Sequence, residues 1–196
     1  MSVKRNHFYH FAVALLWPIL HLIFPHRVTG LENVPAEGAV MLCSNHVSML
    51  DPFFIAGAVK REIRFISKKE LFKNRLLGAI MTKLGMFPVD RGGNDMAAMR
   101  TCISILKEGG VLGIFPQGHR YKHDENHEMQ SGAAFIALRT HVPVVPIHVS
   151  GPVRPFRRTT IHIMPLVDLS DLTRPDAPSI GEATKRLSGA IWTSEN

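Results

Sequence analysis

A histidine and an aspartate five residues apart, His46 and Asp51, are the pair in this chain best suited to general-base chemistry. Such chemistry needs an imidazole to take a proton, and a carboxylate can orient that ring. On a regular helix the two side chains would point about 140° apart, so they meet only if the segment turns. Pro52 favours a turn, because it disfavours α-helical geometry at Asp51. Alternatively, Ser48 and Asp51 form a capping box for the next helix, with His46 a bystander.

Basic residues that follow two predicted strands suit a bound phosphate. Lys69 belongs to a lysine pair after one strand, and Arg91 precedes a pair of glycines after another. An arginine offers a bidentate fork to a phosphate, and glycines expose backbone N–H groups to it. For any one of these residues, an ordinary solvated charge is the simpler interpretation.

A third polar segment, Phe115-Pro116-Gln117-Gly118-His119-Arg120, leads from a predicted buried strand into a glycine turn. Such a turn can aim backbone donors at a developing oxyanion or at a phosphate. A plain strand-to-loop turn explains the hexapeptide about equally well.

Metal, thiol and nucleotide chemistry find little support in the sequence. His119, His123 and His127 recur every four residues, but their stretch is polar and has no apolar stripe, so we expect a solvated loop and no metal site. Cys43 precedes His46 by three residues, yet the alternation of its strand indicates a packed thiol. No nucleophile elbow, phosphate-binding loop, dinucleotide fingerprint or H-E-x-x-H pair is found.

Composition sets the frame for these segments. A chain of 196 residues, 45% hydrophobic and 20% charged, suits one domain with a core of ordinary size. The net charge of +7 favours anionic partners, but no aromatic-basic repeat or reading helix supports nucleic acid. The two cysteines are far apart in apolar surroundings, which indicates reduced thiols and favours the cytoplasmic side.

The uncharged run of residues 8–25 follows Lys4 and Arg5 and contains Pro18. A bilayer-spanning helix needs roughly 20 apolar residues, and this run is slightly short and carries two histidines. We therefore expect residues 1–25 to form a membrane-associating helix on the cytoplasmic face and residues 26–196 to form the catalytic domain. A true span and a plain core helix are the alternatives; a cleaved signal is disfavoured because no small-residue site follows.

Beyond residue 26, short apolar runs alternate with helical patterns, which predicts an α/β fold with a mixed, mostly parallel sheet flanked by helices. The predicted strands are 39–44, 63–67, 86–90, 111–115, 142–149 and an edge strand at 160–167. The predicted helices are 52–59, 70–84, one capped by Asn94 or Asp95 and ended by Gly109-Gly110, 131–140 and 180–192. The polar segments follow strands, so we expect them to share one cleft at the carboxyl edge of the sheet.

In this order the segments resemble the glycerolipid acyltransferase family, best known for its 1-acyl-sn-glycerol-3-phosphate (lysophosphatidate) acyltransferases. The first family motif, N-H-x-S-x-x-D, is met by Asn45, His46, Ser48 and Asp51. Residues 85–91 resemble the next motif, a hydrophobic turn ending in Asp-Arg, and the family's Lys-Lys-Glu-Leu precedes them at 68–71. The third, usually F-P-E-G-T-R, is residues 115–120, and the fourth, an apolar strand with prolines, is 142–147.

The resemblance implies a role for each matching residue. His46 would be the general base that activates the acceptor hydroxyl against an acyl thioester, and Asp51 would orient it. Asn45, Ser48, Lys69, Arg91, Gln117, Gly118 and Arg120 would bind substrate, the basic ones holding its phosphate. The co-substrate would be acyl-CoA or acyl-ACP (acyl carrier protein), with no further cofactor, and membrane lipids would be partners.

Two departures from the family pattern fall in the third motif. Gln117 stands where the family has Glu, and His119 where it has Thr. The amide keeps the length and an acceptor oxygen but loses the charge. Another lysolipid acceptor, a catalytically weak lipid-binding protein and a thioesterase therefore stay open as alternatives to lysophosphatidate acylation.

Overall fold

The computed structural model describes residues 6–90, 95–120, 129–151 and 153–192. Within these ranges one seven-stranded sheet has the order β1-β7-β6-β2-β5-β3-β4. The strands are β1 (His26–Thr29), β2 (Val40–Ser44), β3 (Ile63–Lys68), β4 (Phe87–Val89), β5 (Val111–Ile114), β6 (Val144–Val149) and β7 (Thr159–Ile163). Neighbouring strands are parallel throughout, apart from the antiparallel pair of β6 and β7. The predicted α/β class with a mixed, mostly parallel sheet is confirmed.

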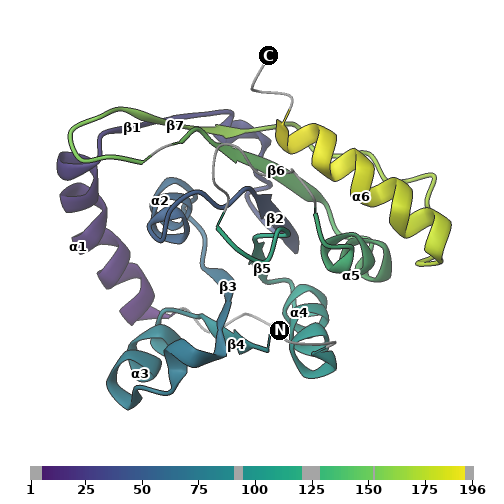
Figure 1. Cartoon of the computed structure of the whole chain (residues 1–196), viewed down its shortest axis with the longest axis horizontal. Coiled ribbons are helices and arrows are strands. Elements are labelled where there is room, and N and C mark those ends of the chain that lie inside the picture. Colours follow the sequence, from purple (N-terminus) through teal and green to yellow (C-terminus); the bar gives the residue numbers. More distant parts are fainter. Residues whose placement is uncertain (1–5, 91–94, 121–128, 152, 193–196) are drawn as a thin grey trace.

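Helices cover both faces of this sheet (Figure 1). They are α1 (His7–Ile23), α2 (Asp51–Ala58), α3 (Arg75–Lys83), α4 (Met96–Lys107), α5 (Gly132–Thr140) and α6 (Ala177–Trp192). Alternate residues of β2 enter two different cores. Val40 and Leu42 pack with residues of α1 and α2, whereas Met41 and Cys43 pack with α4, α5 and α6. Because both faces are covered, the central strand is apolar along most of its length.

Helix α1 is fastened to the body of the protein along one stripe. The Tyr9 hydroxyl accepts a hydrogen bond from the Ile63 N–H at 3.2 Å, which ties the helix to the start of β3. Further along, the Trp17 indole lies against Gly57 of α2 and against the ring of His26. The predicted N-terminal helix is therefore present. In the part of the chain that the structure describes, no helix is both long and apolar enough to cross a bilayer.

Two sequence-based predictions of secondary structure were wrong. The helix expected over residues 70–84 is instead a short 3-10 helix, Lys69–Phe72, followed by α3. Asn74 separates the two, because its side chain accepts hydrogen bonds from the N–H groups of Leu76 and Leu77 and starts a new helix. The strand expected at the edge of the sheet, β7, lies inside it, since the unpredicted β1 pairs with its outer side.

The contact between α1 and α2 yields a test with a matched control. A Cβ added at Gly57 would lie 1.7 Å from Trp17 Cε3, whereas one at Gly181 of α6 would meet no atom within 4 Å. Overpacking typically costs ~1–3 kcal/mol, which outweighs the helix propensity gained. Gly57→Ala should therefore lower the free energy of unfolding, and Gly181→Ala should raise it by ~0.5–1 kcal/mol. Urea denaturation measures both, and equal stability of the two variants would contradict the packing of Trp17.

Candidate active site

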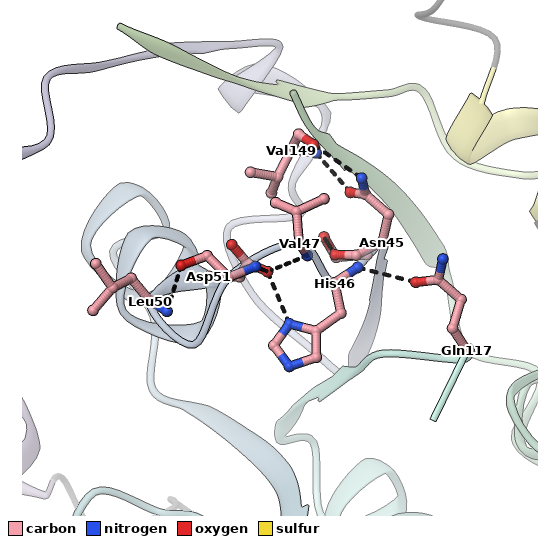
Figure 2. Close-up of polar contacts among 9 residues, drawn as sticks. Asn45, His46, Val47, Leu50, Asp51, Gln117 and Val149 are labelled. Carbon is pink, nitrogen blue, oxygen red and sulfur yellow. Dashed lines mark hydrogen bonds and ion pairs between the residues drawn. The ribbon is translucent and has the colours of Figure 1, made fainter. Parts of the chain in front are cut away.

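The segment that follows β2 is anchored to the neighbouring strand β6. The side-chain amide of Asn45 is buried, donates to the Val149 carbonyl at 2.9 Å and accepts from the Val149 N–H at 2.7 Å (Figure 2). Strand pairing of β2 with β6 ends at Ser44, and these two bonds extend it by one residue. In them the side-chain amide of Asn45 takes the place of a backbone peptide group. Asn45 was predicted to bind substrate; the structure places its polar atoms on the backbone of Val149.

His46 and Asp51 meet, as the predicted turn requires. Asp51 Oδ2 lies 2.8 Å from His46 Nδ1. The carboxylate is fully buried and can only accept, so Nδ1 of the ring carries the proton and donates it. Nε2, which points away from Asp51 in Figure 2, then holds the lone pair of the neutral imidazole. This nitrogen has no hydrogen-bond partner within the described residues.

The same oxygen of Asp51 also organises the backbone between the two residues. Oδ2 accepts from the N–H groups of Val47 at 2.7 Å and Ser48 at 2.8 Å. Asp51 is the first residue of α2, and a helix N-terminus favours negative charge. The bond from the Ser48 N–H is the aspartate half of a capping arrangement, and Ser48 Oγ accepts from Leu50 N–H at 3.2 Å. The capping box is therefore only half formed: α2 has Leu50 at its N-cap with no side-chain cap hydrogen bond, and the Asp51 carboxylate holds His46.

The segment after β5 supports His46 from the other side. Gln117 is buried, and its Oε1 accepts a hydrogen bond from the His46 backbone N–H at 3.0 Å. The ring of Phe115 stacks on the imidazole, with centroids 4.2 Å apart. Gly118 has a φ of 73°, and its N–H donates to the Phe115 carbonyl at 3.0 Å, so the predicted glycine turn is present. Gln117 was predicted to bind substrate, but its oxygen is directed to the backbone of His46.

Phe115 was not singled out from the sequence as part of the site. An aromatic residue at the end of a buried strand is typical of a core position, and nothing in its neighbours indicates which face it takes. Its position directly before the Pro-Gln-Gly turn was the one available signal.

The three residues predicted to hold a phosphate are placed unequally. Lys69 stands at the end of β3 and forms an ion pair with Asp90, and that hydrogen bond raises the pKa of the lysine. Arg120 is exposed at the end of the segment after β5. Arg91 lies outside the described residues. Strands β2, β5, β3 and β4 are parallel neighbours, so the segments after them share one edge of the sheet, as predicted.

A largely apolar cavity of about 680 Å³ opens beside the stacked rings. It lies between α4, α5 and the ends of β3, β4 and β5, and Phe115 forms part of its wall. Other apolar residues that line it are Ile66, Met99, Cys102, Ile114 and Ile136. A cavity of this size is typical of small-molecule sites. Phe115 connects the cavity wall to the ring of His46, which does not itself line the cavity.

Thiol and metal chemistry gain no support from the geometry. Cys43 is fully buried, and that burial raises the pKa of its thiol to about 12, which leaves it un-ionised at neutral pH. Among the described residues no group of histidines, cysteines and carboxylates could hold a metal ion. His123 and His127 of the predicted histidine series lie outside the described residues.

Comparison with known proteins places the chain in a family. The acyltransferase family matches residues 25–150, well over half of the chain. A 1-acyl-sn-glycerol-3-phosphate acyltransferase of Bacillus subtilis is 34% identical over 145 residues, which cover 74% of this chain and 72% of that protein. One from Streptococcus pneumoniae is 29% identical over 182 residues, covering 89% of this chain and 67% of that protein.

A solved structure shows the same fold. The crystal structure of the 1-acyl-sn-glycerophosphate (LPA) acyltransferase of Thermotoga maritima superimposes with a TM-score of 0.66 and 23% identity, covering 97% of this chain and 78% of that one. The fold is thus that of an α/β acyltransferase domain. The chain belongs to the acyltransferase family, and it is an acyltransferase.

The contact between Gln117 and His46 gives a test of what this position does. Gln117→Glu keeps an acceptor oxygen at the same reach, so activity should stay within a few-fold of wild type. Gln117→Leu leaves the partly buried His46 N–H without its acceptor, which costs ~1–3 kcal/mol and should lower kcat while KM for the acceptor changes little. Steady-state kinetics and thermal unfolding measure both effects. A large rise in KM with kcat unchanged would instead assign Gln117 to the substrate headgroup.

Proposed function

We propose that this enzyme transfers a fatty acyl group from an acyl thioester to the free hydroxyl of lysophosphatidate, giving phosphatidate for phospholipid synthesis. The observation that carries the proposal is the hydrogen bond of His46 Nδ1 to the buried Asp51, which leaves Nε2 as the base. The names of the relatives from B. subtilis and S. pneumoniae support lysophosphatidate as the acceptor. Acyl-CoA and acyl-ACP are both proposed as donors, and no further cofactor is needed.

The proposed reaction uses one base and no covalent enzyme intermediate. His46 Nε2 takes the proton from the acceptor hydroxyl as its oxygen attacks the thioester carbonyl. The tetrahedral intermediate collapses, the carbon–sulfur bond breaks, and the imidazolium returns the proton to the leaving thiolate. Asp51 stabilises the charge that the ring gains between these steps. A positioned base of this kind typically contributes ~10²–10⁴-fold to the rate.

The apolar cavity gives the fatty chain a place to bind. Its wall at Phe115 adjoins the imidazole, so a chain inside it would bring its carbonyl end towards His46. Each methylene removed from water contributes about 0.8 kcal/mol, so a long chain supplies binding energy that a short one lacks. We propose that Lys69 and Arg120, which follow β3 and β5 at the same edge of the sheet, contact the phosphate of the acceptor together with Arg91, which is outside the described residues.

The outer stripe of α1 supports contact with a membrane. Phe8, Phe11, Leu15, Ile19 and Leu22 follow helical spacing and are 40–77% exposed. At one end of α1, Lys83 of α3 lies over the Phe8 ring, 5.4 Å from its centroid. Helix α3 itself exposes Leu76, Leu77 and Ile80. We propose that α1 lies in the bilayer interface, and the free thiols of Cys43 and Cys102 support the cytoplasmic face.

The catalytic pair is tested with purified protein, detergent-dispersed lysophosphatidate and a long-chain acyl thioester, following free thiol and phosphatidate together. His46→Ala should lower kcat/KM by ~10²–10⁴-fold, and Asp51→Asn by about 10²-fold or more. His141→Asn, at an exposed histidine that ends α5, is the matched control and should leave kcat/KM unchanged.

Two outcomes would contradict this function, and a third would contradict the mechanism alone. Thiol release without phosphatidate would indicate a thioesterase, and absence of turnover would indicate a lipid-binding protein. Full activity of His46→Ala would refute the mechanism while keeping the reaction.

Membrane contact by α1 is tested by vesicle co-sedimentation. Leu15→Ser with Leu22→Ser removes two exposed apolar side chains of the outer stripe, and each buried leucine contributes ~1.5–3 kcal/mol. The partition coefficient should fall about 10-fold or more. The control, Leu31→Ser with Leu166→Ser, removes two exposed leucines outside α1 and should bind like wild type. Equal partition of both variants would argue that other surfaces carry the binding.

A further inference from the structure

The turn between β6 and β7, residues 153–158, exposes an aromatic ring among three arginines. Phe156 is 78% exposed and has a φ of 58°, in the left-handed region that a bulky residue seldom adopts. The turn is closed by a hydrogen bond from the Arg157 N–H to the Arg154 carbonyl at 3.2 Å. A large apolar side chain is thus held outward in an unfavourable backbone conformation, which indicates a constraint beyond packing.

This turn is attached to the C-terminal end of α1. The Phe156 N–H donates to the Ile23 carbonyl at 2.6 Å, and the Thr159 N–H donates to the Pro25 carbonyl at 3.0 Å. Figure 1 shows the turn, in green, beside the end of α1 that leads into β1. Leu22, the most exposed apolar residue of α1, is next to Ile23 in the chain. The exposed ring therefore continues the apolar surface of α1 at its far end from α3.

The charges of the turn are all of one sign. Arg154, Arg157 and Arg158 are exposed, and within the described residues none of them has an ion-pair partner. The sequence from Gly151 to Val167 contains no aspartate or glutamate. Exposed arginines that surround an apolar side chain complement a surface with anionic headgroups over a hydrocarbon layer.

The turn also begins at the active-site edge of the sheet. β6 ends at Val149, whose backbone is hydrogen-bonded to the Asn45 side chain. Two residues later, a Cβ added at Gly151 would lie 3.5 Å from the Val47 side chain. A contact made by residues 153–158 is thus separated by only a few residues from the segment that carries His46. Fixing the turn at a membrane would orient the catalytic edge towards it.

We propose that residues 153–158 are a second membrane-binding element, in which Phe156 inserts into the bilayer and the three arginines bind headgroups of anionic phospholipids. The proposal rests on the proposed function, since it extends the membrane contact of α1. The lipids that this turn would bind are the bulk anionic phospholipids of the bilayer. They are distinct from the acceptor lysolipid that would bind at His46.

Vesicle co-sedimentation of the full chain tests the arginines, using phosphatidylcholine vesicles with and without phosphatidylglycerol. Arg154→Gln/Arg157→Gln/Arg158→Gln should lower the partition coefficient on anionic vesicles about 10- to 100-fold, since each basic residue near such a surface contributes several-fold. On neutral vesicles it should match wild type. The control, Arg100→Gln/Lys107→Gln/Lys185→Gln, removes three charges from α4 and α6, away from α1 and the turn, and should keep most of the binding (Figure 1).

Phe156→Asn tests the inserted ring, because asparagine tolerates the left-handed conformation that the turn requires. This variant should bind more weakly to both kinds of vesicle while its thermal unfolding midpoint stays unchanged. Binding equal to wild type on both would refute insertion of the ring.

A second assay separates bulk lipid from substrate. With a short-chain lysophosphatidate below its micellar concentration, the triple arginine variant should show wild-type kcat and KM. A raised KM would overturn the proposal and assign the arginines to the acceptor phosphate. The proposal would also be overturned if the control variant lost as much vesicle binding as the triple arginine variant. The same holds if the triple arginine variant kept its vesicle binding but lost binding to a DNA duplex. If wild-type protein shows no turnover, the proposed function fails, while the vesicle measurements still decide the role of the turn.

Discussion

The site depends on one buried oxygen, Oδ2 of Asp51. It accepts hydrogen bonds from the His46 ring and from the backbone N–H groups of Val47 and Ser48. A carboxylate removed from water is costly unless donors and dipoles replace its hydration; here three donors to Oδ2 and the start of α2 replace part of it, while the buried Oδ1 has no hydrogen-bond partner among the described residues. The same hydrogen bonds turn the chain between His46 and Asp51. The Asp51 carboxylate therefore both shapes the turn that brings the two side chains together and supplies the negative charge beside the imidazole.

Much of this site was predictable from residue types, but the directions of several side chains were not. The contact of His46 with Asp51 and the glycine turn were predicted, and the shared edge of the sheet follows from parallel strands. Asn45 and Gln117 were expected to face substrate, and both face backbone. An amide can bond a ligand or a peptide group equally well, so its partner is decided by segments about 70 to 100 residues away in the chain.

The fold was predictable where periodicity is strong and failed where pairing is non-local. Helices α4 and α6 and strands β2, β3 and β6 lie close to their expected positions. β1 is four residues long and has little alternation of its own, and it forms because β7, about 130 residues later, offers a partner. The break before α3 did have a local signal, Asn74, which the apolar run on either side concealed.

On the proposed function, the two faces of α1 link folding to lipid binding. Tyr9 and Trp17 hold one face of the helix in the core of the catalytic domain, while the other face is bare. A partner that binds this exposed face more tightly in the folded chain than in the unfolded one stabilises the whole domain by mass action. On the proposed function, a bilayer is thus a thermodynamic ligand of this enzyme as well as its source of substrate. Molecules away from lipid would then be the first to unfold and be degraded, which would confine the active enzyme to the surface where its acceptor lies.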